Sequence, residues 1–236
     1  ASGGSHVTYT NNKGTSAQNE TAYTVTVKAD DNYAFSDGTV QKTLSCVIHR
    51  ANGYVTLDSD KTVEFGTTST TFTVSSHHGG TLSVADPSGT PTASISGSTV
   101  TIANIGAVTA GSTVSVTVTS GQTAQYNVAS ATFTLTISKK ANAITATNKT
   151  IYVNATQDIS SLISNAKGTL SYTIKSQTTT GSSLNGSILT AGVLSSSNDN
   201  DGTVIVTVTD DGGTNYSSSS VDVTITVQKY TRTLTW

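Results

Sequence analysis

An internal repeat with a period of about 90 residues constrains this chain more than any single motif does. The segment "DKTVEF" at residues 60–65 returns as "NKTIYV" at residues 148–153, an offset of 88 residues. The segment "GTLS" at residues 80–83 returns at residues 168–171 with the same offset. Segments that keep one order and one spacing indicate a structural unit that the chain carries more than once.

A second segment and a tyrosine recur with a similar period. "GSHVT" at residues 4–8 reappears as "GSTVT" at residues 97–101 and as "GSILT" at residues 186–190. Each recurring tyrosine lies in the turn before the last strand of its copy. We expect it to bury its ring and hydrogen-bond nearby backbone, as in a tyrosine corner; the alternative is a surface that stacks on sugars. These tyrosines, spaced 93 and 90 residues apart, are Tyr33, Tyr126 and Tyr216.

The phase of the repeat predicts the domain organisation. Residues 1–50 correspond to the C-terminal half of a unit, residues 51–140 and 141–229 to complete units, and residues 230–236 to the first strand of a further unit. The chain begins Ala-Ser-Gly-Gly and has no methionine, so we expect it to be a window on a longer polypeptide.

Within a copy, β-branched apolar residues alternate with Thr or Ser, which predicts strands with one buried face. The faces formed in this way carry Val114, Val116 and Val118 in one copy and Val204, Val206 and Val208 in the next. Gly-, Asn-, Asp- and Ser-rich turns separate the short strands. We therefore predict an all-β chain of tandem immunoglobulin-like antiparallel β-sandwiches arranged end to end.

Composition excludes several classes of function. Charged residues make up 11% of the chain and the formal net charge is −2, so no cluster of Lys and Arg is available to bind nucleic acid. No apolar run is long enough to span a membrane. No Ser-His-Asp grouping, paired carboxylates or phosphate-binding glycine motif suggests catalysis, and we predict that the chain is not an enzyme.

The repeated unit resembles the bacterial immunoglobulin-like (Big-type) domains that occur in tandem on bacterial surface proteins and in phage structural proteins. The resemblance covers essentially the whole chain. It rests on the period, the "GSxVT" segment, the "VxVTVT…Y…TxTI" ending and the short junctions. Cadherin-like and fibronectin-like sandwiches share many of these features, although the "LDRE" and "DxNDN" calcium motifs of cadherins are not evident here.

Three sets of polar residues are candidates for chemistry. Adjacent residues on a strand point to opposite faces, so His77 and His78 are interpreted as part of a turn and not as a metal site. Calcium prefers oxygen ligands, and acidic loops near the ends of the last unit offer Asp199, Asp201, Asp210 and Asp211 as calcium candidates. Asx-rich turns explain the same residues without an ion, so no resident cofactor is predicted. Cys46 has no partner for an intrachain disulfide and is expected to be a small buried apolar side chain.

Three functional hypotheses follow. The first is a non-enzymatic stalk or spacer within a larger bacterial cell-surface or phage virion protein, whose partners are neighbouring repeats. The second is an adhesion module for a host glycan or protein, for which the spare aromatics Tyr54, Tyr152, Tyr172, Tyr230 and Trp236 are scattered. The third is a filament assembled by strand exchange, in which the donated strand carries Tyr230, Leu234 and Trp236.

Overall fold

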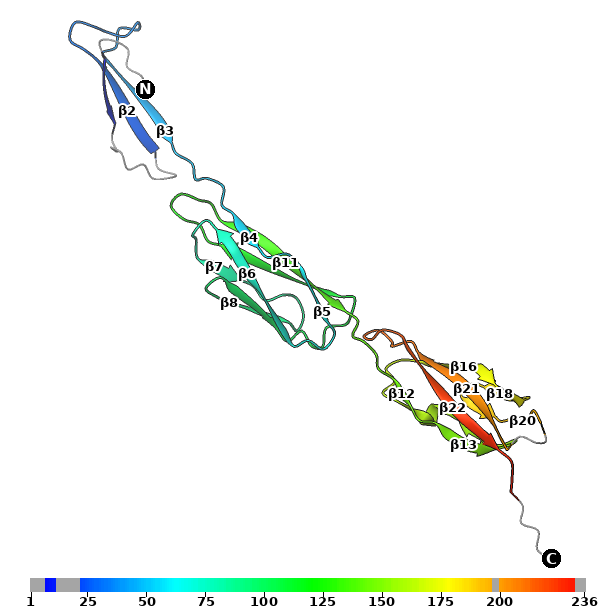
Figure 1. Ribbon diagram of the computed structural model, residues 1–236. Coiled ribbons are helices and arrows are strands. Elements are labelled where there is room, and N and C mark those ends of the chain that lie inside the picture. Colours follow the sequence, from blue (N-terminus) through cyan, green and yellow to red (C-terminus); the bar gives the residue numbers. More distant parts are fainter. Residues whose placement is uncertain (1–6, 12–21, 197–199, 232–236) are drawn as a thin grey trace, which may run out of the picture. The chain divides into compact units, whose positions relative to one another are not determined.

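The computed structural model describes residues 7–11, 22–196 and 200–231, and this part of the chain is almost entirely β-structure (Figure 1). The prediction of an all-β fold is therefore confirmed. A single 3-10 turn, η1 (Ile159–Leu162), interrupts the strands of the described residues. Within the described ranges, no helix has the length and apolar character needed to cross a membrane.

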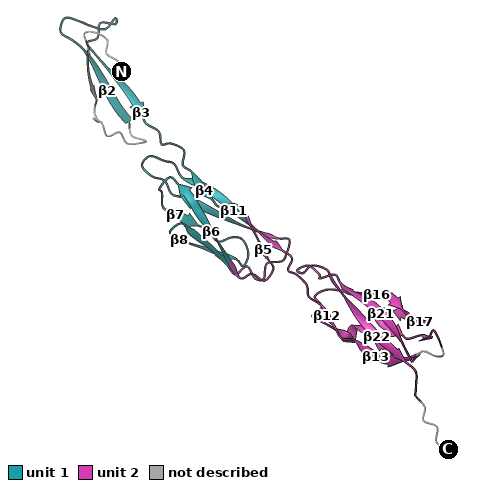
Figure 2. Ribbon diagram, viewed as in Figure 1, with its two compact units in different colours: residues 1–59, 70–103, 115–134 teal, residues 60–69, 104–114, 135–236 magenta. Residues whose placement is uncertain are grey.

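The chain divides into two compact units (Figure 2). The first unit comprises residues 1–59, 70–103 and 115–134, and the second comprises residues 60–69, 104–114 and 135–236. This division passes through the predicted repeat at residues 51–140, so the repeat boundaries given above stay a prediction.

The first unit begins with a three-stranded antiparallel sheet in the order β1-β2-β3. A four-stranded sheet follows in the order β4-β6-β9-β8, and β7 pairs antiparallel with β10. The strand bounds are β1 (Val7–Asn11), β2 (Ala22–Ala29), β3 (Gln41–Val47), β4 (Val55–Leu57), β6 (Ser69–His77), β7 (Leu82–Val84), β8 (Thr92–Ser96), β9 (Thr99–Ala103) and β10 (Thr113–Ser120).

The core of the first unit joins residues from two sheets. The rings of Phe72 on β6 and Phe133 on β11 (Ala129–Ser138) are stacked, with centroids 4.0 Å apart and planes inclined by 3°. Both residues are almost fully buried, as are Val100, Ile102, Val116 and Val118. Alternate residues of β10 therefore point inward, as the period-two pattern predicts.

The second unit contains sheets in the orders β13-β22-β21-β16, β14-β19-β18, β12-β15 and β17-β20. It also holds β5 (Lys61–Glu64), which pairs with the C-terminal half of β11. The remaining bounds are β12 (Thr145–Ala146), β13 (Lys149–Tyr152), β14 (Thr156–Asp158), β15 (Ile163–Ser164), β16 (Leu170–Gln177), β17 (Thr179–Thr180), β18 (Ser183–Asn185), β19 (Ile188–Thr190), β20 (Val193–Leu194), β21 (Asp201–Asp210) and β22 (Ser219–Gln228).

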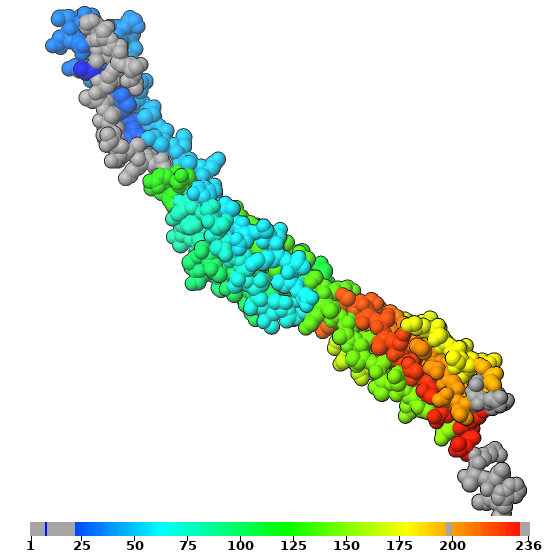
Figure 3. All heavy atoms as spheres, in the orientation of Figure 1, coloured from blue at the N-terminus to red at the C-terminus, as the bar shows by residue number. Residues whose placement is uncertain are grey.

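One apolar cluster holds these strands of the second unit together. Figure 3 shows the orange and red atoms of β21 and β22 packed against the green and yellow atoms of the preceding strands. The predicted inward face of β21 is confirmed, because Val204, Val206 and Val208 are fully buried. The other fully or almost fully buried members of the cluster are Ile159, Leu189, Ala191, Val223, Ile225 and Val227.

The pairing departs from the all-antiparallel sandwich predicted from the sequence. β5 runs parallel to β11, with Val63 opposite Ile137, and β13 runs parallel to β22, with Ile151 opposite Val227. The reason is that the first strand of the repeat is divided into two segments, which belong to different sheets. β4 pairs antiparallel with β6, whereas β5, three residues further on, belongs to the sheet of β11.

Candidate functional site

Backbone hydrogen bonds join the loop that carries the repeat tyrosine to a residue at or directly before the start of the same repeat, and we call this contact the backbone clamp. Ala51 forms a parallel bridge with Tyr126. The Ala51 amide donates to the Gln125 carbonyl at 2.8 Å, and the Ala51 carbonyl accepts from the Asn127 amide at 2.9 Å. The chain entering the repeat is therefore tied to the turn that precedes the last strand.

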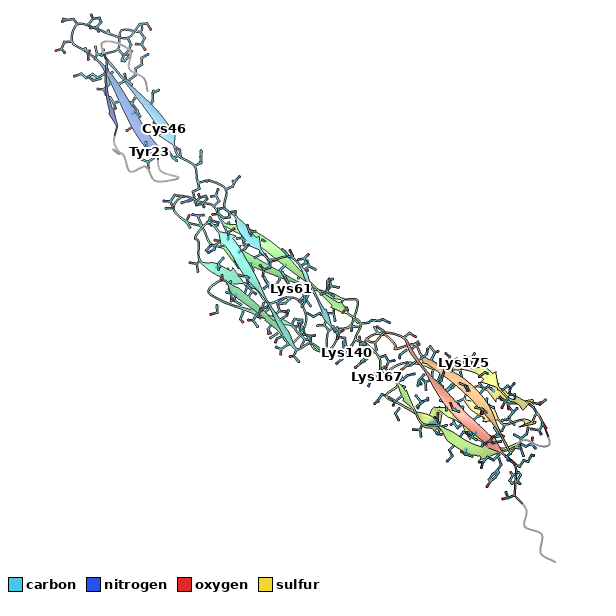
Figure 4. The ribbon with its side chains drawn as sticks, in the orientation of Figure 1. Tyr23, Cys46, Lys61, Lys140, Lys167 and Lys175 are labelled. Atoms are coloured by element: carbon cyan, nitrogen blue, oxygen red, sulfur yellow. The ribbon has the colours of Figure 1, made fainter. Side chains whose placement is uncertain are left out.

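The same clamp recurs one repeat later. Lys140, labelled in Figure 4, forms a parallel bridge with Tyr216. The Lys140 amide donates to the Asn215 carbonyl at 3.0 Å, and the Ser217 amide donates to the Lys140 carbonyl at 2.9 Å. The recurring tyrosines thus mark a backbone contact that the sequence pattern alone does not reveal.

The tyrosine rings have different surroundings in the three places. The half-buried ring of Tyr126 contacts the edge of Tyr54, with centroids 6.2 Å apart, and lies 5.5 Å from His78. The ring of Tyr216 meets Phe65 edge-on at 5.8 Å and lies 5.5 Å from the Lys167 ammonium.

Tyr33 is 50% exposed, and its amide donates to the Asp30 carbonyl at 3.0 Å. None of the three tyrosine rings is fully buried. The structural role expected of them stays a prediction.

His78 is a buried side chain whose two ring nitrogens both have backbone partners. Nδ1 lies 3.1 Å from the Tyr54 amide and 3.0 Å from the Tyr54 carbonyl, and Nε2 lies 2.9 Å from the Gly121 carbonyl. With its proton on Nε2, the ring donates to the Gly121 carbonyl and accepts from the Tyr54 amide. Both ring nitrogens therefore face backbone partners.

His77 is the last residue of β6, and its ring lies near the same hydroxyl group, that of Ser120, as the ring of His78. Its Nδ1 accepts from the Gly79 amide at 3.1 Å and lies 3.4 Å from Oγ of the buried Ser120. Nε2 of His78 lies 3.4 Å from the same oxygen. The two rings therefore converge on one hydroxyl, although adjacent strand residues were expected to point apart. The bend that starts at His78 turns its side chain inward.

Asp210 is a fully buried carboxylate surrounded by N–H donors. Its oxygens accept from the amides of Lys167 at 2.6 Å, Gly168 at 2.8 Å and Gly212 at 2.9 Å, and from Nδ2 of Asn142 at 2.9 Å. Burial by itself raises the pKa of Asp210, but the hydrogen bonds outweigh it and hold the pKa below its ordinary value. This carboxylate organises the loop as an internal acceptor.

The other calcium candidates do not gather around Asp210. Asp211 accepts from the amides of Thr169 and Gly213, both at 2.9 Å. Asp201 begins β21 and Asp210 ends it, so their backbones are about 30 Å apart along an extended strand. Asp199 lies outside the described residues. Over the described ranges, no group of three or more His, Cys, Asp and Glu could hold a metal ion.

Cys46 corrects an expectation from the sequence. Its side chain was predicted to be buried, but it is exposed on β3, next to Tyr23 on β2 (Figure 4). The reason is that the described residues provide no second sheet over this strand. Every residue of β3 is exposed, including Leu44 at 63%.

The proposed strand-exchange segment is only partly described. Tyr230 follows β22 and is 63% exposed, and its ring stacks on that of Tyr152 with centroids 4.6 Å apart. Leu234 and Trp236 lie outside the described residues. Tyr152 is also exposed, and the sequence spacing did not predict that these two rings stack on each other.

Comparisons with known proteins identify no family. No family model matches the sequence, and no curated protein does. Among solved structures, the chain is similar to extracellular cadherin domains 3–6 of protocadherin gamma B2, with 15% identity and a TM-score of 0.33 over 89% of this chain and 57% of that one. For domains EC1–4 of Drosophila N-cadherin the identity is 16% and the TM-score 0.39, over 91% of this chain and 59% of that one.

A glycoside hydrolase is also similar at a lower level. An endo-fucoidan hydrolase from glycoside hydrolase family 107 shows 11% identity and a TM-score of 0.28 over 92% of this chain and 35% of that one. The chain thus spans little more than half the length of the two cadherin chains. The sheets and buried cores described above establish the immunoglobulin-like sandwich class.

Proposed function

We propose that this chain is a non-enzymatic spacer of tandem immunoglobulin-like repeats within a larger extracellular protein of a bacterial cell surface or a phage virion. The recurring backbone clamp carries this proposal. Ala51, the first residue of one predicted repeat, is bridged to Tyr126, and Lys140, the residue directly before the next predicted repeat, is bridged to Tyr216. A spacer needs such a device at each junction, because an untied linker would let neighbouring domains turn freely.

Long basic side chains strengthen the same junctions. Nε of Arg50 donates to the Thr123 carbonyl at 3.2 Å, and Nζ of Lys139 donates to the Gly213 carbonyl at 2.8 Å. Both cations lie one residue before the clamp. Short, hydrogen-bonded junctions without Gly-Ser spacers favour a semi-rigid array.

Further contacts of this kind lie within the second unit. The Ala110 amide donates to Oδ1 of Asn215 at 3.0 Å. Beside it, the rings of Phe65 and Tyr216 meet edge-on. These local contacts support the proposal that the tyrosine loop serves a structural purpose.

Single-molecule force spectroscopy on the full chain tests the spacer proposal. We expect two separate unfolding events, each releasing a contour length of about 30 nm for a repeat of about 90 residues. One merged event, or extension without force peaks, would contradict independent load-bearing repeats. Immunogold labelling of cells and virions then decides between the two locations.

A second candidate function rests on the exposed Tyr152–Tyr230 pair. The two rings stack on each other, and their exposed outer sides offer a surface on which a sugar could stack, which fits an adhesion module for a host glycan or protein. A glycan array should then show binding that Tyr152→Ala and Tyr230→Ala both abolish. Tyr33→Ala is the matched control, because it removes an exposed tyrosine from another part of the chain. The absence of any binding would leave the spacer as the function.

A further inference from the structure

Two adjacent histidines form a cluster with a buried serine near the start of the predicted repeat 51–140. His77 and His78 each have a ring nitrogen 3.4 Å from the hydroxyl oxygen of Ser120, which is fully buried. The ring of His78 also packs on the entry segment, residues 51–54, since a Cβ on Gly53 would lie 2.8 Å from its Cε1 atom. The histidine cluster, formed by His77, His78 and Ser120, therefore connects β10 with the first residues of the repeat.

The last repeat has no imidazole at the corresponding place. The segment "HHGGTLS" at residues 77–83 aligns with "NAKGTLS" at residues 165–171 through the shared "GTLS", so asparagine and alanine replace the two histidines. The segment "VTVTS", which ends at Ser120, aligns with "VTVTD", which ends at Asp210. The same place therefore holds two bases in one repeat and a carboxylate in the other.

The entry segments of the two repeats differ in a matching way. The two backbone clamps align these segments so that Gly53 corresponds to Asn142. Gly53 leaves room for the ring of His78, whereas Asn142 carries a side chain whose Nδ2 donates to Asp210 at 2.9 Å. Each repeat thus ties its entry segment to the end of the corresponding strand, one through an imidazole and the other through a carboxylate.

The hydrogen bonds of the histidine cluster suit neutral imidazoles. Nδ1 of His77 accepts from the Gly79 amide, and Nδ1 of His78 accepts from the Tyr54 amide, both at 3.1 Å. A second proton on either ring points an N–H group at another N–H group. His78 keeps a partner when it is charged, because the Tyr54 carbonyl lies 3.0 Å from the same nitrogen. Nδ1 of His77 has only the more distant Ser120 hydroxyl, so its protonation breaks a hydrogen bond without an equal replacement.

The charges near the cluster do not compensate added protons. The titratable side chains whose rings meet His78 are Tyr54 and Tyr126, with centroids 6.0 and 5.5 Å from its own. Arg50 places a positive charge at the tyrosine loop, because its Nε donates to the Thr123 carbonyl at 3.2 Å. Among the described residues, neither histidine has a carboxylate as a hydrogen-bond or ion-pair partner. Two charged rings would therefore repel each other across one hydroxyl.

We propose that the histidine cluster is a pH-sensitive switch that holds the entry segment of the repeat 51–140 at neutral pH and releases it in mild acid. Imidazole takes up its second proton as the pH falls from about 8 to about 5. The amides of Gly79 and Tyr54 then lose their acceptors, and the turn at residues 77–80 loosens its hold on residues 51–54. The switch goes beyond the spacer role and would act equally in an adhesion module.

The last repeat serves as an internal reference for this switch. The pKa of Asp210 is lowered, so its carboxylate is still charged at about pH 5. It therefore continues to accept from Asn142 and from the amides of Lys167 and Gly168 over the range in which the histidines titrate. Acid of this strength should open the entry of one repeat and leave the entry of the other closed.

Amide hydrogen exchange of the full chain, measured by NMR and corrected for the intrinsic effect of pH on exchange, tests the switch. We expect the protection factors of the Gly79 and Tyr54 amides to fall at least about tenfold between about pH 7.5 and about pH 5. The protection factors of the Lys167 and Gly168 amides, which donate to Asp210, should change by less than about twofold.

Two substitutions sharpen the test. His77→Asn introduces the residue that the last repeat has at this position, and its side-chain oxygen accepts a hydrogen bond without titrating in this range. We expect this variant to keep its Gly79 protection at about pH 5 within about twofold of the value at about pH 7.5. His49→Asn is the matched control, because it removes an exposed histidine outside the cluster and should leave the loss of protection as it is in the unmodified chain.

Several results would overturn the proposal. Equal protection of the Gly79 and Tyr54 amides at both pH values would mean that the cluster does not respond to acid. A loss that persists in His77→Asn, or that extends to Lys167 and Gly168, would mean that acid acts elsewhere in the chain. If His77→Asn does not fold at about pH 7.5, NMR titration of the His77 and His78 rings in the unmodified chain decides, because a loss of protection without a change in their charge refutes the switch.

Discussion

The carboxylate of Asp210 accepts a hydrogen bond from the backbone amide of Lys167 at 2.6 Å, across 43 residues of sequence. Three further N–H groups converge on the same buried side chain. A buried acceptor with several donors is a point at which one substitution leaves many groups unsatisfied.

Asp210→Asn should therefore destabilise the last repeat. The amide places an NH₂ group among N–H donors, and we expect the free energy of unfolding of this repeat to fall by about 3 kcal/mol. Asp201→Asn is the matched control, because Asp201 lies exposed at the opposite end of β21. Calorimetry that resolves the transitions of the repeats would contradict the prediction if both variants melted alike.

The free energy of unfolding of the last repeat should depend on pH through the ionisation of Asp210. In the folded chain the pKa of Asp210 is lowered, whereas an Asp in the unfolded chain has a pKa of about 3.9. The ionised carboxylate therefore stabilises the fold fully above pH of about 4, and this contribution is lost as the pH falls through the folded pKa. We expect the stability difference between the wild-type protein and Asp210→Asn to be constant from pH 7 to about pH 5 and to narrow below about pH 4. A difference that widened in acid would refute the assignment.

The Phe72–Phe133 stack predicts a localised loss of stability. Phe72→Ala should cost about 3–5 kcal/mol, because it removes a fully buried ring and leaves a cavity. Only one transition should shift, since the apolar cluster of the last repeat does not include this ring. Thr132→Ala, on the exposed face beside Phe133, should change stability by less than about 1 kcal/mol. A shift of every transition would show instead that the repeats unfold together.

The repeated "GTLS" segment has a steric reason at its glycine. A Cβ on Gly80 would overlap the Gly121 carbonyl, and a Cβ on Gly168 would overlap Asp211 and the Gly213 amide. We expect Gly80→Ala and Gly168→Ala each to destabilise their own repeat by about 1–3 kcal/mol. Gly106→Ala is the control, because its nearest neighbour would lie 3.5 Å away. Chemical denaturation of the three variants measures the difference, and equal midpoints would argue against a close approach.

Calcium should have little effect on stability. The oxygens of Asp210 and Asp211 already accept N–H groups, and we propose that the chain holds no resident ion. The melting temperatures in about 2 mM calcium and in excess EDTA should agree within about 1 °C. An increase of several degrees with calcium, absent in Asp201→Asn, would place an ion near the start of β21.

Sequence alone was sufficient for the elements that follow local alternation. Val116 and Val206 were predicted to point inward from the period-two pattern, and both are fully buried. This succeeds because the pleat of a strand sends successive side chains to opposite faces whatever the partner strand is. The recurrence of the same pattern also predicted the immunoglobulin-like class.

Tertiary structure decided the features that depend on residues far apart in the chain. The parallel pairing of β5 with β11 joins segments more than 70 residues apart, and no local pattern specifies its direction. His78 lies in a bend, yet it is buried because the Gly121 carbonyl comes within 2.9 Å of its ring. Cys46 has the spacing of a core residue but is exposed, because burial requires a second sheet over the strand and not only an apolar position within it.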